Sequence, residues 1–193
     1  MVSKTREKFI EVARQLFARK GVENTTMNDI ASASSKGRRT IYTYFKSKTE
    51  IFNAVIETET DKILSRLRLT LSKQLPPDEK FREYISVRFD AMKEIVGRNG
   101  SLRAGFFRDV RKVERTQRLI ASKEVALLCD ILEEGVEKGV FEIQDIKKEA
   151  VIIIHSVQGL IVPFIRDGLA EYGISSERIK EMVADMILKG ISK

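Results

Sequence analysis

The stretch Thr26–Phe45, TMNDIASASSKGRRTIYTYF, decides the fold of the N-terminal quarter of this chain. Thr26-x-x-Asp29 resembles a helix capping box, and the apolar residues after it recur at helical spacing. A turn of small residues follows, and Gly37 is an acceptable N-cap for a second short helix. Two short helices joined by such a turn are the pattern of a helix-turn-helix.

The second helix of this motif has one apolar side and one polar side. If Ile41 faces the core, Phe45 joins it one turn later. The outward-facing and flanking positions are then polar or basic and can hydrogen-bond base edges or phosphates: Arg38, Arg39, Thr40, Tyr42, Thr43 and Lys46. The alternative interpretation is an ordinary solvated basic face.

The positive charge of the chain is confined to the same region. Residues 1–48 hold 11 Lys and Arg against 4 Asp and Glu, whereas the other 145 residues hold 24 of each. The formal net charge of +7 therefore belongs entirely to the first quarter of the chain. Charge concentrated in one small segment indicates a polyanionic partner at that segment.

Helical periodicity continues through the remaining sequence and predicts an all-α protein of about nine helices. We expect an N-terminal three-helix domain over residues 1–48, with its motif at about 26–45, and a second helical domain over 49–193. Gly21 should end the first helix, and Ser47-x-x-Glu50 should open a fourth that links the domains. Pro76-Pro77 precedes a fifth helix that ends near Gly97, and a sixth covers roughly 101–113. The seventh should end at Gly139, Asp145 should cap the eighth, and Ser175 or Ser176 should cap the ninth.

The eighth predicted helix is apolar almost all round. Its uncharged stretch, Ala150–Ile165, is 16 residues long and falls short of the roughly 20 residues that a membrane span needs, so we predict a helix covered on several sides. Pro163 should kink it or end it early. The ninth helix is amphipathic, with one apolar face made of Ile179, Met182, Val183, Met186 and Ile187. These two helices and their symmetry mates could form a four-helix dimer interface, or they could close the core of the monomer.

Three segments together resemble the N-terminal domain of the TetR family of transcriptional regulators. They are Leu16-Phe17-Ala18-Arg19-Lys20-Gly21-Val22, Thr25-Thr26-Met27-Asn28-Asp29-Ile30-Ala31 and Thr40-Ile41-Tyr42-Thr43-Tyr44-Phe45-Lys46-Ser47-Lys48. The resemblance covers about residues 3–63. It implies a homodimer that binds double-stranded operator DNA, a small-molecule effector in the C-terminal domain, and release from DNA when the effector binds.

The resemblance also assigns roles to individual residues. It places Thr26 and Lys48 on phosphates and Tyr44 near the DNA backbone. Arg38, Arg39, Thr40, Tyr42 and Thr43 would lie in or beside the major groove. The turn departs from the family, which usually has Ala-Gly-Val followed by a capping Ser or Thr. Here Ser34-Ser35-Lys36 and Gly37 occupy those places, which predicts a turn of different shape.

The effector site is less marked in the sequence. Aromatic and polar residues at helical spacing make Phe89, Phe106, Phe107, His155 and Gln158 candidates for a ligand pocket, although such a stripe is more often core. His155, the single histidine, is more often a hydrogen-bonded core residue than a ligand contact. Cys129, the single cysteine, reads as a buried structural thiol rather than a redox sensor, because no basic neighbours lower its pKa.

Enzyme classes find little support. One His and one Cys exclude the common zinc constellations, and neither a phosphate-binding Gly-rich loop nor a nucleophile elbow occurs in the sequence. We expect no enzyme activity, cofactor, metal or membrane partner. The single cysteine allows no internal disulfide, and residues 1–20 lack the apolar segment of a signal peptide, so we expect a cytoplasmic protein.

The sequence therefore favours a ligand-responsive, DNA-binding repressor that dimerises through its last two helices. Two other hypotheses remain open at this point. One is a constitutive or architectural DNA-binding protein without an effector, and the other is a helical protein-interaction module whose basic segment binds an acidic partner.

Overall fold

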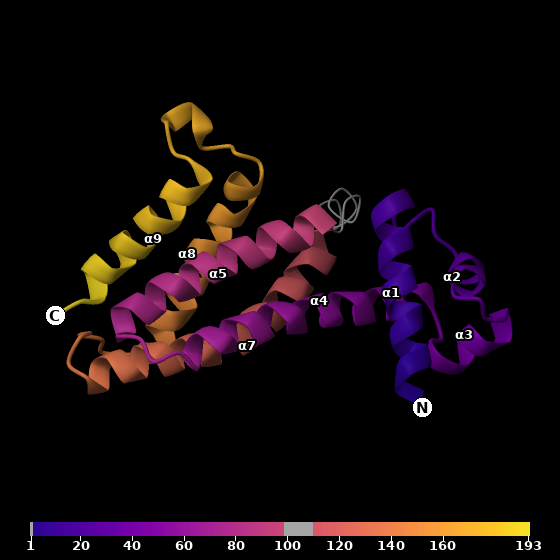
Figure 1. The fold of residues 1–193 in the computed structure, drawn as a ribbon, viewed down its shortest axis with the longest axis horizontal. Coiled ribbons are helices and arrows are strands. Elements are labelled where there is room, and N and C mark those ends of the chain that lie inside the picture. Colours follow the sequence, from indigo (N-terminus) through magenta and orange to yellow (C-terminus); the bar gives the residue numbers. More distant parts are fainter. Residues whose placement is uncertain (1, 99–109) are drawn as a thin grey trace. The chain divides into compact units, whose positions relative to one another are not determined.

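The computed structural model describes residues 2–98 and 110–193, with the side chains of residues 4–98 and 122–193. Within those residues the secondary structure is eight α-helices and one 3-10 helix, which confirms the all-α prediction (Figure 1). The helices are α1 (Val2–Lys20), α2 (Met27–Ala33), α3 (Arg38–Tyr44), α4 (Lys48–Leu71), α5 (Pro77–Arg98), α7 (Val110–Glu137), α8 (Ile146–Ile165), η1 (Ala170–Tyr172) and α9 (Ser176–Ile191). The sixth helix expected at 101–113 falls largely outside the described residues, and its last positions belong to α7.

Capping side chains set where most of these helices begin. Thr26, Asp145 and Ser175 each accept a backbone N–H three residues later, as the sequence predicted for α2, α8 and α9. The predicted box at the start of α4 forms only in part. Ser47 Oγ accepts from the N–H of Glu50 at 3.2 Å, but the Glu50 carboxylate accepts from the N–H of Lys46 at 2.6 Å instead of from Ser47.

The chain divides into two compact units. Unit 1 comprises Met1–Asp61 and Ile95–Thr116, and unit 2 comprises Lys62–Glu94 and Gln117–Lys193. The helix α4 therefore contributes residues to both units. The domain boundary that the sequence placed at residue 48 stays a prediction.

The core of unit 1 is formed by apolar side chains from α1, α2, α3 and the first half of α4. Phe17 of α1 meets Phe52 of α4 edge to face, with ring centroids 6.1 Å apart. Ile41 and Phe45, which the sequence analysis placed in the core, are buried, and this confirms that prediction. The other buried apolar residues of this core include Phe9, Ile10, Ala13, Leu16, Phe17, Met27, Ile30, Ala31, Ile51, Phe52 and Val55.

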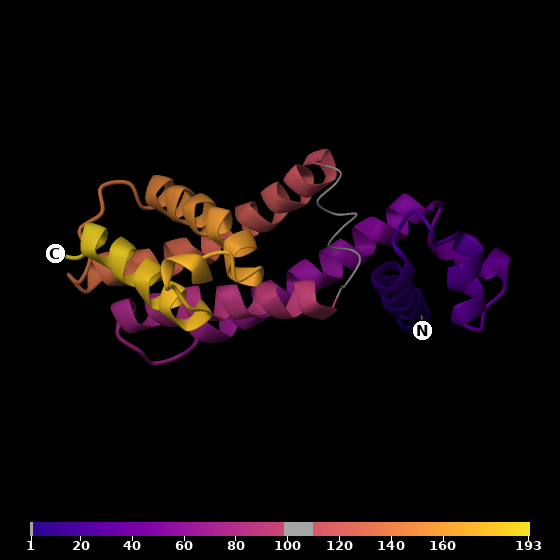
Figure 2. The same ribbon diagram turned by 90° about the horizontal axis from the view of Figure 1, so that it is seen from above.

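In unit 2, side chains of the helix α5 contact α4, α7, α8 and α9; Figure 2 shows these helices from above. Ion pairs join it to α4 through Arg66 and Glu94, to α7 through Lys80 and Glu134, and to α9 through Arg82 and Asp185. Its contact with α8 is aromatic, because Phe89 and Phe164 stack edge to face with centroids 4.8 Å apart.

The last two helices are only partly covered within the single chain, so the cover expected on several sides of α8 stays a prediction. One face of α8 is covered, but the other is not, and Ile152 is 59% exposed. In α9, Ile179 and Val183 are buried while Met186 is 74% exposed, so the single chain covers only part of the predicted apolar face. Both helices carry apolar residues over a wider arc than one core can cover. The helix α8 also continues two residues beyond Pro163.

By length and composition alone, α8 is apolar enough to cross a membrane, with a mean hydropathy of 1.5 over its most apolar window. About a third of that window is buried inside the chain. Core helices of soluble proteins pass the same test, so this finding by itself does not indicate a membrane span.

Candidate DNA-binding surface and effector domain

The helices α2 and α3 form a helix-turn-helix because each buries a small apolar set against α1. Ile30 of α2 and Ile41 of α3 are fully buried, and Phe45, the residue after α3, is 1% exposed. Tyr44 is half-buried and its ring packs on Phe9 of α1, with centroids 5.8 Å apart. These contacts fix the side of α3 that faces inward.

The turn between α2 and α3 is closed by backbone hydrogen bonds. The N–H of Ser35 donates to Ser32 at 2.9 Å, and the N–H of Lys36 donates to Ala31 at 3.0 Å. This pair of bonds is a Schellman motif, which requires a left-handed residue just after the helix. Ser35 supplies that conformation with φ of 56°, and Lys36 is exposed.

The first turn of α2 is held by Thr26, Asp29 and Lys20. Thr26 Oγ accepts from the N–H of Asp29 at 3.1 Å, and the Asp29 carboxylate accepts from the N–H of Thr26 at 2.8 Å. Lys20 Nζ lies 3.0 Å from the same carboxylate. The N–H of Thr26 and then the Lys20 ammonium lower the pKa of Asp29 to about 2. Asp29 therefore stays ionised and keeps Thr26 in place.

The opposite side of α3 is a recognition surface made of exposed polar and basic residues. Its members are Arg38, Arg39, Tyr42, Thr43 and Lys46, all exposed in the structure. The Arg38 guanidinium lies over the Tyr42 ring, 5.9 Å from its centroid, and the Thr43 hydroxyl donates to the carbonyl of Arg39 at 3.2 Å. Thr40 is half-buried at the edge of this surface.

Lys48 has a structural role that the sequence did not suggest. Its ammonium donates to the carbonyls of Val22 at 2.7 Å and Glu23 at 3.2 Å, which ties the start of α4 to the loop after α1. The sequence analysis also missed Arg6, whose guanidinium lies 5.2 Å from the centroid of the Phe45 ring. The signal available in the sequence was that Arg6 lies about one helical turn before the core residue Phe9. The predicted DNA contacts of Thr26, Tyr44 and Lys48 stay predictions.

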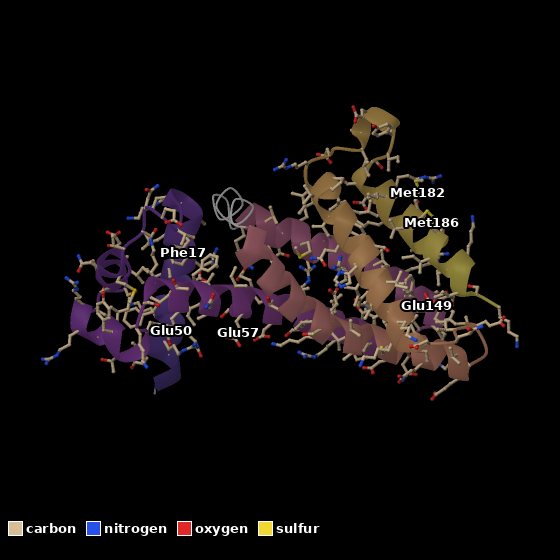
Figure 3. The ribbon with its side chains drawn as sticks, turned by 180° about the vertical axis from the view of Figure 1, so that it is seen from behind. Phe17, Glu50, Glu57, Glu149, Met182 and Met186 are labelled. Atoms are coloured by element: carbon tan, nitrogen blue, oxygen red, sulfur yellow. The ribbon has the colours of Figure 1, made fainter. Side chains whose placement is uncertain are left out.

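An exposed apolar face runs along α8 and α9, two helices that contact each other. We define this outer face by Val151, Ile152 and Val162 of α8 and by Met182 and Met186 of α9, all exposed. Figure 3 shows the two methionines along α9. His155 and Ser156 are exposed on α8 as well, so the interpretation of His155 as a core histidine was wrong. It lies on the side of α8 that the monomer core leaves open.

The predicted ligand-pocket residues are found in different surroundings. Phe89 is fully buried in the core against Phe164, His155 is exposed, and Gln158 is half-buried. Phe106 and Phe107 lie outside the described residues. All five residues stay candidates, as the sequence analysis proposed.

A buried polar cluster of Tyr84, Arg88 and Glu124 occupies the interior of unit 2. Arg88 Nε donates to Glu124 Oε1 at 2.5 Å, Arg88 Nη2 donates to Oε2 at 3.3 Å, and the Tyr84 hydroxyl donates to Oε1 at 3.1 Å. Burial, and then the Glu124 charge, raises the pKa of Tyr84 well above its usual value. Sequence analysis missed this cluster. Its signal was an arginine at a core position of α5, beside Phe81, Ile85 and Phe89.

Cys129 is half-buried, and burial followed by the charges of Glu133 and Asp130 raises the pKa of its thiol. The thiolate is therefore disfavoured, in line with the lack of basic neighbours in the sequence, although Cys129 is less buried than the sequence analysis expected. Among the residues that the structure describes, no group of three or more His, Cys, Asp or Glu side chains could hold a metal ion.

Part of this chain matches a known protein family. Residues 9–55 match the sequence profile described as "Bacterial regulatory proteins, tetR family". The chain is also 36% identical over 93 residues to the probable acrEF/envCD operon repressor of Escherichia coli strain K12. That alignment covers 48% of this chain and only 42% of the repressor.

Solved structures share the fold over nearly the whole chain. A transcriptional regulator from Cytophaga hutchinsonii superimposes with a TM-score of 0.75 at 23% identity, covering 97% of this chain and 98% of that one. SmeT of Stenotrophomonas maltophilia, in complex with triclosan, superimposes with a TM-score of 0.70 at 20% identity, covering 99% of this chain and 93% of SmeT. At these identities the likeness establishes the fold.

Proposed function

We propose that this chain, whose residues 9–55 match the tetR family of bacterial regulatory proteins, is a cytoplasmic, DNA-binding transcriptional repressor released from its operator by a small molecule. The similar E. coli protein is named a probable operon repressor. SmeT is named the repressor of a multidrug efflux pump, and a structure of SmeT in complex with triclosan is known. The first name supports a repressor, and the SmeT complex with triclosan supports a regulator that responds to a ligand.

The observation that carries this proposal is the recognition surface of α3. Ile41 and Phe45 fix the orientation of α3, so Arg39, Tyr42 and Thr43 are exposed together. An Arg presented in the major groove can bind guanine O6 and N7, and a Thr methyl can contact thymine. Thr26 is exposed at the first turn of α2, where a Thr side chain can hydrogen-bond a phosphate.

The outer face of α8 and α9 supports a homodimer. Exposed apolar residues are unfavourable in water when they are contiguous, and a self-complementary face can bury them against a second copy of the chain. Two copies would present two recognition helices to one duplex. Dimers of helix-turn-helix proteins read half-sites about 34–36 Å apart, in successive major grooves.

Release by an effector follows from linkage. A ligand that binds more tightly to a dimer whose recognition helices no longer match that spacing lowers the affinity for DNA. The helix α4 contributes residues to both units and is our candidate for the element that transmits this change.

Fluorescence anisotropy tests DNA binding directly. The purified protein is titrated onto DNA from upstream of its own gene and onto scrambled DNA of equal length, at two salt concentrations. We expect a preference of about 10³-fold or more for the specific site. Arg39→Ala/Tyr42→Ala should abolish that preference, whereas Lys147→Ala, which removes an exposed charge at the start of α8, should retain it.

The other outcomes separate the competing hypotheses. Equal affinity for both DNAs, reduced only by added salt, would support an architectural protein. This conclusion also requires that a selection from genome-wide DNA fragments yields no preferred site. Absence of binding to either DNA at low salt would refute the DNA-binding assignment and favour a protein-interaction module.

A further inference from the structure

The buried polar cluster of unit 2 is unusual because it places a full ion pair inside an apolar helical core. Arg88 of α5 is 5% exposed and Glu124 of α7 is 1% exposed. The neighbouring core positions on the same two helices are apolar, including Phe81, Ile85 and Leu128. A buried ion pair is weak evidence for a role in stability, because apolar residues of similar volume usually serve as well or better.

The hydrogen bonds within the cluster leave one strong donor unused. Both oxygens of Glu124 are occupied, Oε1 by Tyr84 and by Arg88 Nε, and Oε2 by Arg88 Nη2. Arg88 Nη1 is buried and, among the side chains that the structure describes, has no hydrogen-bond partner. Buried donors in native proteins are nearly always paired with a protein group, a water or a ligand, so Nη1 is a donor that a bound molecule can use.

The charge of the cluster defines what can bind there. The Arg88 guanidinium and the Glu124 carboxylate cancel, so the pair is neutral as it stands. A second carboxylate at Nη1 would bury an uncompensated negative charge, which is strongly unfavourable. A carbonyl or hydroxyl oxygen would accept from Nη1 without changing the buried charge.

We propose that Arg88 Nη1 is the hydrogen-bond donor that recognises the effector, and that the effector is an uncharged, largely apolar molecule with a carbonyl or hydroxyl oxygen. This inference rests on the proposed function, since it specifies the ligand of the effector domain. Glu124 and Tyr84 act as positioning residues that hold the guanidinium.

Three small probes of similar size test the proposal. Acetophenone carries a neutral acceptor, cumene replaces the carbonyl by an apolar group, and benzoate carries a negative charge. Their binding to the full-length protein is measured from the rise in Tm with probe concentration, at constant protein concentration. In the wild type we expect acetophenone to bind about tenfold more tightly than cumene, with benzoate weaker than acetophenone.

Variants of the cluster should change this order in defined ways. Glu124→Gln leaves the Arg88 charge uncompensated, so benzoate should now bind more tightly than acetophenone. Arg88→Met/Glu124→Met removes both charges, should fold because no buried charge remains unpaired, and should bind acetophenone and cumene equally. Lys80→Met/Glu134→Met is the matched control: it removes another ion pair between α5 and α7 and should keep the wild-type order.

Several results would overturn the proposal. They are equal binding of acetophenone and cumene to the wild type, tightest binding of benzoate, no binding of any probe, or an unchanged preference in Arg88→Met/Glu124→Met. The thermal measurement needs no DNA, so it is independent of the repressor assignment. Specific DNA binding without the expected probe order would refute this inference alone, and the probe order without specific DNA binding would refute the repressor function alone.

Discussion

At the scale of single residues, Ser35 shows how a turn can impose a conformation on an unsuited side chain. The Schellman motif that ends α2 needs a left-handed residue, and Ser35 adopts it with φ of 56°. The left-handed region is unfavourable by about 1–2 kcal/mol for residues with a Cβ, whereas Gly enters it freely. The bonds of Ser35 and Lys36 to α2 hold the strained conformation in place.

Ser35→Gly should therefore stabilise the protein. We expect a gain of about 0.5–1 kcal/mol in the free energy of unfolding, because the relief of strain exceeds the extra backbone entropy of Gly. Urea denaturation at a fixed protein concentration measures this gain as a higher midpoint with an unchanged slope. Ser35→Ala retains the Cβ and should give no gain. An equal gain in both variants would show that strain is not the cause.

Asp29 makes the stability of the N-terminal domain depend on pH in a defined direction. Its pKa is lowered to about 2 by the N–H of Thr26 and by Lys20, against roughly 3.9 in an unfolded chain. The stabilisation from the ionised carboxylate is thus present above the unfolded pKa and is lost as pH falls through the folded one.

The variant Asp29→Asn isolates this contribution. We expect the difference in stability between wild type and Asp29→Asn to be constant from pH 7 to pH 5 and to shrink below pH 4, approaching its minimum near pH 2. Denaturant unfolding of both proteins across this range measures it. A difference that grows on acidification would contradict the lowered pKa.

At the scale of elements, a tertiary contact requires glycine at position 135 of α7, although glycine is a poor helix former. A Cβ at this position would lie 1.9 Å from a carbon of the Phe141 ring, which is itself buried. The chain after α7 folds back over the helix at this point, since the N–H groups of Val140 and Phe141 both donate to the carbonyl of Gly135. Glycine lets the ring lie directly on the helix backbone.

Gly135→Ala should destabilise the protein, although alanine is the better helix former by about 1 kcal/mol. Overpacking against Phe141 should dominate and lower the free energy of unfolding by about 1–3 kcal/mol. Gly190→Ala in α9 is the control, because nothing lies within 4 Å of its added Cβ, and it should be neutral or stabilising. Thermal unfolding distinguishes the two, and a stabilised Gly135→Ala would show that the ring moves away.

At the scale of the whole molecule, the two most apolar helices, α8 and α9, are buried on only one side within the single chain. The buried sides of α8 and α9 close the core of unit 2, and their outer face remains exposed. If that face forms the proposed dimer interface, oligomeric state and DNA affinity depend on the same residues.

Ile152→Glu should convert the dimer into a monomer, because it places a charge in the apolar outer face. Specific DNA affinity should fall by about 10²-fold or more, since the two half-sites would no longer be bound by one linked molecule. Light scattering after size exclusion measures the mass, and anisotropy measures the affinity. Leu69→Glu is the matched control, because Leu69 is 65% exposed on α4, outside the outer face. A dimeric Ile152→Glu protein would exclude this interface.

Effector and operator should also affect each other's binding equally. If the effector lowers the affinity for DNA by some factor, operator DNA must lower the affinity for the effector by the same factor. Isothermal titration of an identified effector with and without operator DNA measures this. Equal effector affinity in both cases would refute release by linkage.

The N-terminal domain was predictable from sequence because its interactions are local. Thr26 caps a helix three residues away, and Ile41 and Phe45 are one turn apart, so short-range spacing determined the helices, their inward faces and the exposed surface of α3. The same rules located the caps Asp145 and Ser175. Residue type and helical periodicity are sufficient wherever the partner lies within one or two turns.

Only the tertiary structure revealed features that join distant segments. Arg88 and Glu124 are 36 residues apart, and their pairing, like the unused Nη1 donor, depends on how α5 packs against α7. Lys48 binds carbonyls about 25 residues earlier, and His155 is exposed because the core covers only one side of α8. Sequence periodicity identifies a helix as apolar or amphipathic, but which of its sides is covered is decided by the packing of the whole chain.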